Sequence, residues 1–132
     1  MSKLIKRLIK TGIELDNALV IGEDVVPLED LISKFKTVFV VSDTKPKIRA
    51  SNLIYRSFES DLNILPSISV FFIKEEYNSS ISKYLPYLTK SKATLVIWNS
   101  NNIEKEKLKP LLNYKYKRIS KQYEYHFWKP TA

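Results

Sequence analysis

Ala18-Leu19-Val20-Ile21-Gly22 is a short apolar run that ends in glycine. A second run of the same kind, Val38-Phe39-Val40-Val41-Ser42-Asp43, follows and is closed by an acid. Continuous apolar runs rich in β-branched and aromatic residues are typical of strands that are covered on both faces, as in a parallel sheet. The two runs therefore predict parallel strands, with a glycine turn after the first and a carboxylate after the second.

The same pattern continues along the chain. Apolar runs at residues 53–55, 68–73 and 93–98 predict three further strands. Helical segments are expected between the runs, at residues 27–35, 81–88 and 103–112, and a short helix or loop at 44–50. Pro27 suits the first turn of the first of these helices, and the acids that follow it suit its positive end. Strands that alternate with helices predict an α/β fold built on a parallel sheet.

The two ends of the chain have patterns of their own. Residues 1–12 pair apolar with basic residues at helical spacing and stop at Gly12, so they predict an N-terminal amphipathic helix. Such a helix either lies on a membrane surface or packs on the edge of the domain, and its shortness favours packing. Residues 114–129 alternate in period two, which predicts an antiparallel β-hairpin at the edge of the sheet.

Composition limits the function classes. A length of 132 residues suits a single domain, residues 1–132, with one core. The chain has no cysteine and one histidine, His126, so disulfides, thiolate metal sites and a zinc cluster are not expected. No run is apolar enough for a membrane span and no signal peptide is evident, so we expect a cytoplasmic protein. The formal net charge of +8 favours anionic partners, although a lysine-rich composition also accounts for it.

Five strand runs followed by a terminal hairpin resemble the class I S-adenosylmethionine-dependent methyltransferase fold. The resemblance covers roughly residues 13–130. It also includes the aromatic and basic last strand, Tyr125-His126-Phe127-Trp128-Lys129, and the segment before the run at 93–98. It implies a three-layer αβα, Rossmann-like sandwich with a mostly parallel sheet. It implies S-adenosylmethionine as the cofactor, bound at the carboxyl ends of the strands.

The family's glycine loop is degenerate in this sequence. Gly22 matches the first glycine of the family's acid-apolar-Gly-x-Gly-x-Gly pattern, but Val20 stands in place of the acid. Asp24 and Val26 replace the second and third glycines. Their side chains would crowd a backbone that wraps the amino-acid end of the cofactor. The resemblance therefore implies that binding of S-adenosylmethionine is weak or lost.

The other residues that the resemblance implies are acids. Asp43 matches the acid that binds the ribose hydroxyls, since two carboxylate oxygens suit two vicinal hydroxyls. Asp61 or Glu59 matches the acid that contacts adenine, and Glu23 or Asp24 is placed to meet the cofactor's cationic ammonium group. Each also has a simpler interpretation: Gly22 as a plain turn, Asp43 as the cap of a following helix, and the other acids as solvated loop residues. The cofactor-binding candidates are Gly22, Glu23, Asp43 and Asp61, no metal is expected, and no catalytic residue is assigned.

Three functions remain open. The first is a degenerate methyltransferase-like domain that acts as a binding or assembly module, with a protein partner. The second is an active methyltransferase on an unknown acceptor. The third is a nucleic-acid-binding protein, because the tail interleaves tyrosines with cations that suit bases and phosphates. The candidate nucleic-acid residues are Lys115, Lys117, Arg118 and Lys121.

Overall fold

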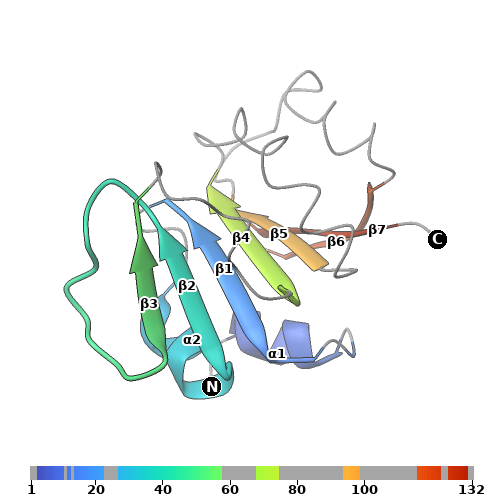
Figure 1. The fold of residues 1–132 in the computed structure, drawn as a ribbon. Coiled ribbons are helices and arrows are strands. Elements are labelled where there is room, and N and C mark those ends of the chain that lie inside the picture. Colours follow the sequence, from blue (N-terminus) through green and yellow to red (C-terminus); the bar gives the residue numbers. More distant parts are fainter. Residues whose placement is uncertain are drawn as a thin grey trace.

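The computed structural model describes residues 3–10, 12, 14–22, 27–57, 68–74, 94–98, 116–122 and 125–130. In these ranges two helices, α1 (Lys3–Lys10) and α2 (Leu28–Lys34), accompany a single sheet (Figure 1). The strands of the sheet are β1 (Asn17–Ile21), β2 (Thr37–Val41), β3 (Leu53–Arg56), β4 (Val70–Lys74), β5 (Thr94–Trp98), β6 (Tyr116–Gln122) and β7 (Tyr125–Pro130).

The strands are arranged in the order β3-β2-β1-β4-β5-β7-β6. β1 pairs in parallel with β2 on one side and with β4 on the other, and β3 and β5 extend the parallel pairing outward. The parallel strands predicted at residues 19–21, 38–41, 70–73 and 95–98 are therefore confirmed. β7 pairs antiparallel with β5 and with β6, and a register shift between Arg118 and Ser120 interrupts the second pairing.

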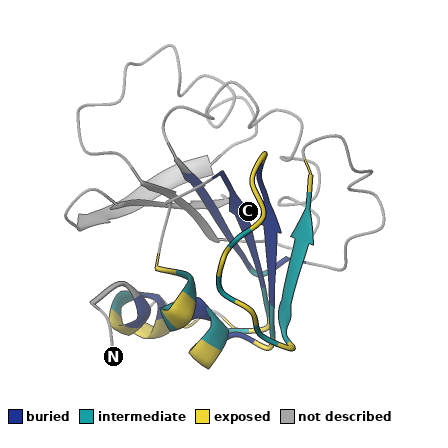
Figure 2. Ribbon diagram, turned by 90° about the vertical axis from the view of Figure 1, so that its left-hand side faces the viewer, coloured by how far each residue is buried: buried dark blue, intermediate teal, exposed yellow. Residues whose placement is uncertain are grey.

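One face of the sheet packs against both described helices. Ile5 and Leu8 of α1 and Leu31 of α2 are buried against alternate residues of β1, β2 and β4 (Figure 2). At the centre of this cluster, the rings of Phe35 and Phe72 make an edge-on contact, with centroids 6.4 Å apart. The apolar residues of α1 thus pack against the sheet rather than lie exposed for a membrane surface. Packing was the alternative that the short length of the predicted helix favoured.

The opposite face of the sheet is buried to the same extent. Leu19, Phe39 and Phe71, which alternate with the residues facing the helices, are at most 6% exposed. Burial on both faces explains why the parallel strands are continuous apolar runs rather than alternating ones. The helices predicted at residues 81–88 and 103–112 lie outside the described residues. No helix in the described ranges has the length and apolar character needed to cross a bilayer.

The connection from β2 to β3, residues 42–52, contains no helix. It runs back outside β3, the edge strand, before the chain re-enters the sheet (Figure 1). Its end is fixed by Asn52, whose side-chain amide donates to the carbonyls of Ile32 (2.9 Å) and Phe35 (3.1 Å). These carbonyls lie at the carboxyl end of α2, where backbone acceptors lack partners within the helix. Asn52 therefore ties the start of β3 to the end of α2.

Replacing Asn52 by Ala should destabilise the domain by about 1 to 3 kcal/mol, because it leaves two carbonyls without their donor. Ser51→Ala, at the exposed neighbouring position, is the matched control and should change stability by less than about 0.5 kcal/mol. Urea unfolding followed by circular dichroism measures both. Equal stability of the two variants would show that the Asn52 amide does not hold this corner together.

Candidate functional site

The carboxyl ends of β1, β2 and β3 lie level and form one rim of the sheet, which we call the carboxyl rim. Ile21 is in register with Val41 and with Ile73, and Val41 is in register with Arg56. The chain moves outward from β1 through β2 to β3 and then returns to β4 on the other side of β1. Ligands of open α/β sheets bind beside such a reversal, outside the carboxyl ends of the strands.

Gly22 forms the turn at the end of β1. Its φ is 105°, a value that side chains disfavour, and it is buried. Its amide donates to the carbonyl of Val41 at 2.8 Å, which continues the pairing with β2 one residue past the strand. The chain must therefore turn sharply at this position, and glycine is the residue that permits it.

Ser42 fixes the rim after β2. Its side chain is polar but only 1% exposed, which sets it apart from the apolar buried residues in the part of the chain whose burial is described. Its amide donates to the carbonyl of Arg56 (3.2 Å) and its hydroxyl to the carbonyl of Thr44 (2.6 Å). Its own carbonyl accepts from the hydroxyl of Tyr55 at 2.9 Å. These three bonds hold the backbone on either side of Asp43.

Asp43 is exposed at this fixed position of the rim. No helix follows it, since residues 42–52 are irregular, so the interpretation of Asp43 as a helix cap is wrong. Within the described ranges, no hydrogen bond or ion pair engages its carboxylate. Among the residues that the structure describes, both carboxylate oxygens are thus open to a donor such as a pair of hydroxyls.

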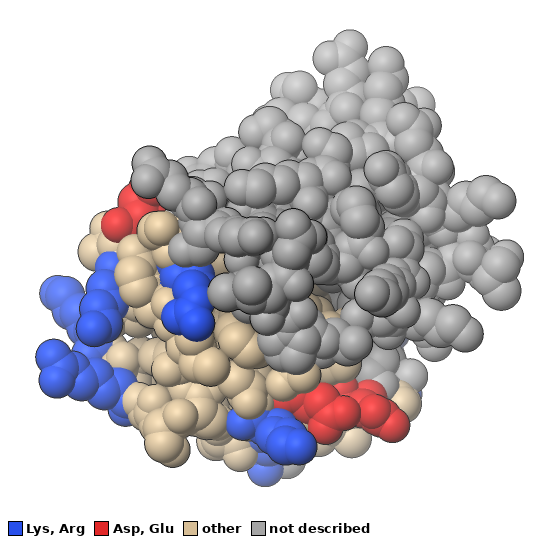
Figure 3. All heavy atoms as spheres, in the orientation of Figure 1, with Lys and Arg blue, Asp and Glu red and all other residues tan. Residues whose placement is uncertain are grey.

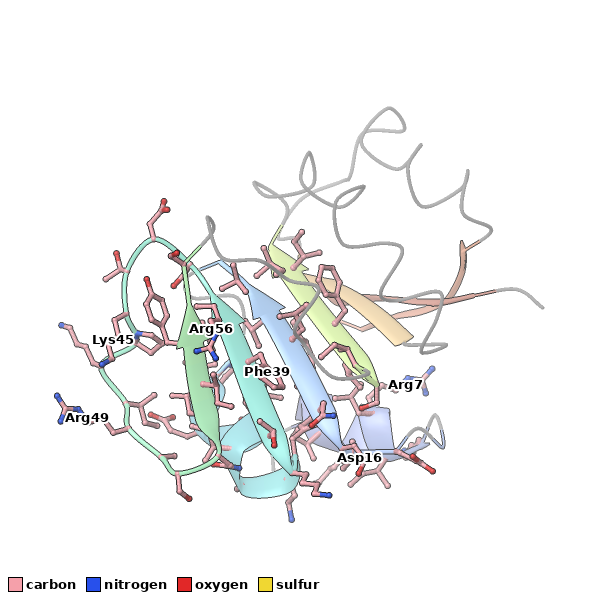
Figure 4. All side chains as sticks on the ribbon, viewed as in Figure 1. Arg7, Asp16, Phe39, Lys45, Arg49 and Arg56 are labelled. Carbon is pink, nitrogen blue, oxygen red and sulfur yellow. The ribbon has the colours of Figure 1, made fainter. Side chains whose placement is uncertain are left out.

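Arg56 ends β3 beside Ser42. Its side chain is half-buried and donates from Nη1 to the carbonyl of Tyr55 at 3.0 Å. Figure 4 shows it close to β2 and β3. A guanidinium at this rim adds positive charge, which suits an anionic ligand better than a sulfonium cation.

Val20 occupies the position that corresponds to the acid of the family's glycine loop. It is 1% exposed and packs in the cluster that faces α1 and α2, together with Val38, Val40 and Phe72. A carboxylate in this place would be buried without a partner, at a cost of several kcal/mol. The position has become part of the core.

The structure brings Gly22 and Asp43 to the same rim, as expected from the sequence. Glu23 and Asp61 lie outside the described residues, as do Glu59 and Lys115. Lys117, Arg118 and Lys121 lie on β6, at the edge of the sheet remote from β3. In the described ranges, no three acidic, histidine or cysteine side chains gather as metal ligands.

Sequence reasoning missed Ser42, Tyr55 and Arg56 as residues of the rim. Each stands at or directly after the end of an apolar run, which is the signal that could have found them. The bonds of Ser42 could not be read from sequence, because its partner Tyr55 lies 13 positions further along the chain.

Gly22→Ala should destabilise the protein more than Gly12→Ala. Gly12 has a φ of 75° and open space around an added Cβ, so alanine there costs about 1 kcal/mol of left-handed strain. Gly22 is buried and lies further from the left-handed region, so alanine should cost up to about 3 kcal/mol. Thermal and urea unfolding of both variants measure the difference. If Gly12→Ala proved the more harmful change, the turn at Gly22 would not be the constrained one.

Solved structures match this fold over nearly the whole chain. The N-methyltransferase NodS from Bradyrhizobium japonicum WM9 gives a TM-score of 0.60 at 13% identity, covering 98% of this chain and 93% of that chain. Magnesium protoporphyrin IX methyltransferase (ChlM) from Synechocystis PCC 6803, with bound SAM, gives 0.58 at 12% identity, with 97% and 76% covered. TrmK from M. capricolum, in complex with S-adenosyl-homocysteine, gives 0.52 at 12% identity, with 98% and 67% covered.

No protein-family model and no curated protein sequence matches this chain. At identities of 12 to 13%, the structural matches show the fold alone. Together with the parallel order of β3, β2, β1, β4 and β5, they lead to one conclusion. The chain has a class I methyltransferase-like fold.

Proposed function

We propose that this chain is a methyltransferase-like domain that has lost tight binding of S-adenosylmethionine and acts as a binding or assembly module. The proposal takes residues 1–132 as one three-layer αβα domain, with residues 114–129 as its antiparallel hairpin. The antiparallel pairing of β6 with β7 supports this architecture. Solved structures with the same fold hold S-adenosylhomocysteine or SAM, so the fold itself is compatible with the cofactor.

The burial of Val20 is the observation that carries the proposal. The acid of the family's loop would have to enter a cluster in which Val20, Val40 and Phe72 are at most 2% exposed. The neighbouring loop adds side chains at Asp24 and Val26, where the family has bare glycine. Three of the loop positions that meet the amino-acid end of the cofactor in the family, Val20, Asp24 and Val26, thus differ here. That end of the cofactor does not fit this chain.

Asp43 favours the alternative, an active S-adenosylmethionine-dependent methyltransferase on an unidentified acceptor. Its exposed carboxylate at the rim fits the ribose end of the cofactor. An enzyme of this kind works by holding the acceptor in line with the methyl group that the cofactor supplies. No described residue is assigned to acceptor binding. We therefore propose that a ribose-binding remnant persists without the rest of the site.

Calorimetry with S-adenosylmethionine and S-adenosylhomocysteine tests the proposal. We expect a dissociation constant weaker than about 10 µM, near −7 kcal/mol. Any residual binding should weaken further in Asp43→Asn. It should be unchanged in Asp16→Asn, which removes an exposed acid from the opposite end of the sheet (Figure 4). Binding tighter than 10 µM that depends on Asp43 would establish the alternative.

Restoring the two glycines tests the crowding directly. The double variant Asp24→Gly/Val26→Gly should bind S-adenosylhomocysteine about tenfold more tightly than the wild type, equal to about 1.4 kcal/mol. The physical reason is that removal of two side chains lets the backbone approach the ligand. Calorimetry of the variant, with thermal unfolding to confirm its fold, gives the answer. An unchanged affinity would mean that the loop side chains are not what excludes the cofactor.

A further inference from the structure

The connection between β2 and β3 carries a row of cations. Lys45, Lys47 and Arg49 are all exposed, and we call them the cationic strip. Figure 4 places Lys45 and Arg49 at the outer side of β3, and Figure 3 shows Lys and Arg side chains gathered over the same edge. The strip belongs neither to the cofactor-binding candidates nor to the nucleic-acid candidates of the tail that the sequence indicated.

The strip has a regular pattern of exposure. Exposed residues at positions 45, 47, 49 and 51 alternate with half-buried residues at 46, 48, 50 and 52. The side chains of Lys45, Lys47 and Arg49 are therefore more exposed than the residues between them. Several cations in succession along one connection can contact successive phosphates of a nucleic-acid backbone.

The cations of the strip outnumber the acids near them in sequence. Residues 43–57 contain Arg56 in addition to the strip and one acid, the exposed Asp43. Within the described ranges, no ion pair engages Lys45, Lys47 or Arg49. The whole chain also has a formal net charge of +8, so the field around the strip is reinforced rather than cancelled.

We propose that the cationic strip binds the phosphate backbone of single-stranded nucleic acid without reading its sequence. Exposed aromatic side chains that could stack bases are absent from residues 44–52. Tyr55 is half-buried, and its hydroxyl is engaged by Ser42. Recognition is therefore electrostatic, through repeated cation-to-phosphate contacts.

Two other anionic surfaces fit the strip less well. A membrane-surface segment needs exposed apolar residues beside its cations. In the part of the chain whose burial is described, one large apolar residue is exposed. It is Ile9, which lies on α1 and not on the strip. A specific protein interface is centred on buried anchors, mostly aromatic residues and arginine. Residues 45–49 contain one arginine, the exposed Arg49, and no aromatic residue. A repeated polyanion is the partner that matches repeated cations.

The proposal does not depend on the cofactor, because the strip lies outside the carboxyl rim and uses none of Gly22, Asp43 or Val20. It also differs from nucleic-acid binding by the tail, which involves the opposite edge of the sheet. If either cofactor prediction fails, the proposal for the strip still stands. If the strip does not bind nucleic acid, the cofactor proposal still stands.

Fluorescence anisotropy of the full chain with a labelled 20-nucleotide oligo(U) tests the proposal. The strip variant Lys45→Gln/Lys47→Gln/Arg49→Gln should bind about tenfold more weakly at low salt. Its slope of log affinity against log salt should be shallower by about 2, from three phosphate contacts at about 0.7 each. Lys6→Gln/Arg7→Gln/Lys10→Gln removes the same charge from α1, whose Arg7 lies away from Lys45 and Arg49 (Figure 4), and should keep most of the affinity. Oligonucleotides of other sequence should bind equally, and unchanged thermal unfolding of both variants shows that they are folded.

Several results would overturn the proposal. Wild-type protein that does not bind oligo(U) at 50 mM salt is one. Equal weakening in the strip and α1 variants is another, because it would mean that net charge alone attracts the ligand. Loss of binding only in Lys115→Gln/Lys117→Gln/Arg118→Gln/Lys121→Gln would place the interaction on the tail. Tighter binding to phosphatidylserine vesicles or polyglutamate than to oligo(U) would assign the strip to a membrane or an acidic protein.

Discussion

The fold depends on β1, a central strand that is paired on both edges and shielded from solvent on both faces. Its backbone pairs with β2 and β4, and its residues from Ala18 to Ile21 are buried on both sides of the sheet. Such a strand has no room for polar side chains along its length, because an unpartnered polar group there would cost several kcal/mol. Chemistry is therefore confined to the ends of the strands and the edges of the sheet. The carboxyl rim and the cationic strip occupy these two kinds of position.

The same confinement bears on the proposed loss of cofactor binding. In this chain the residue two positions before Gly22 is a valine that fills the core between β1 and α2. Returning an acid to that position would remove apolar packing and bury a charge at once, so the site cannot be repaired by one substitution. Asp43 has no such constraint, since the bonds of Ser42 hold its backbone while its side chain stays in solvent. The proposed ribose contact at Asp43 is thus independent of the proposed loss at Val20.

The sequence predicted the sheet well because burial on both faces leaves a direct trace in composition. Val38 to Val41 has β-branched or aromatic residues at every position, and the structure places this run in β2. Polar contacts leave no such trace. The interpretation of Asp43 as a helix cap was wrong because, of the short helix and the loop that the sequence left open at residues 44–50, the structure has an irregular connection. The link from Asn52 to the end of α2 was equally invisible, because it joins residues 17 and 20 positions apart.

The absence of a helix between β2 and β3 has a consequence for charge. A helix in this place would put residues 45 and 49 on one face and residue 47 on the opposite one, since successive residues turn by about 100°. The irregular connection instead leaves all three exposed, with half-buried residues between them. The apolar residues Pro46, Ile48 and Ala50 are half-buried, so none of these apolar residues is fully exposed beside the cations. The conformation that removes the helix cap from Asp43 is therefore the one that gathers these cations into a row at the edge of the sheet.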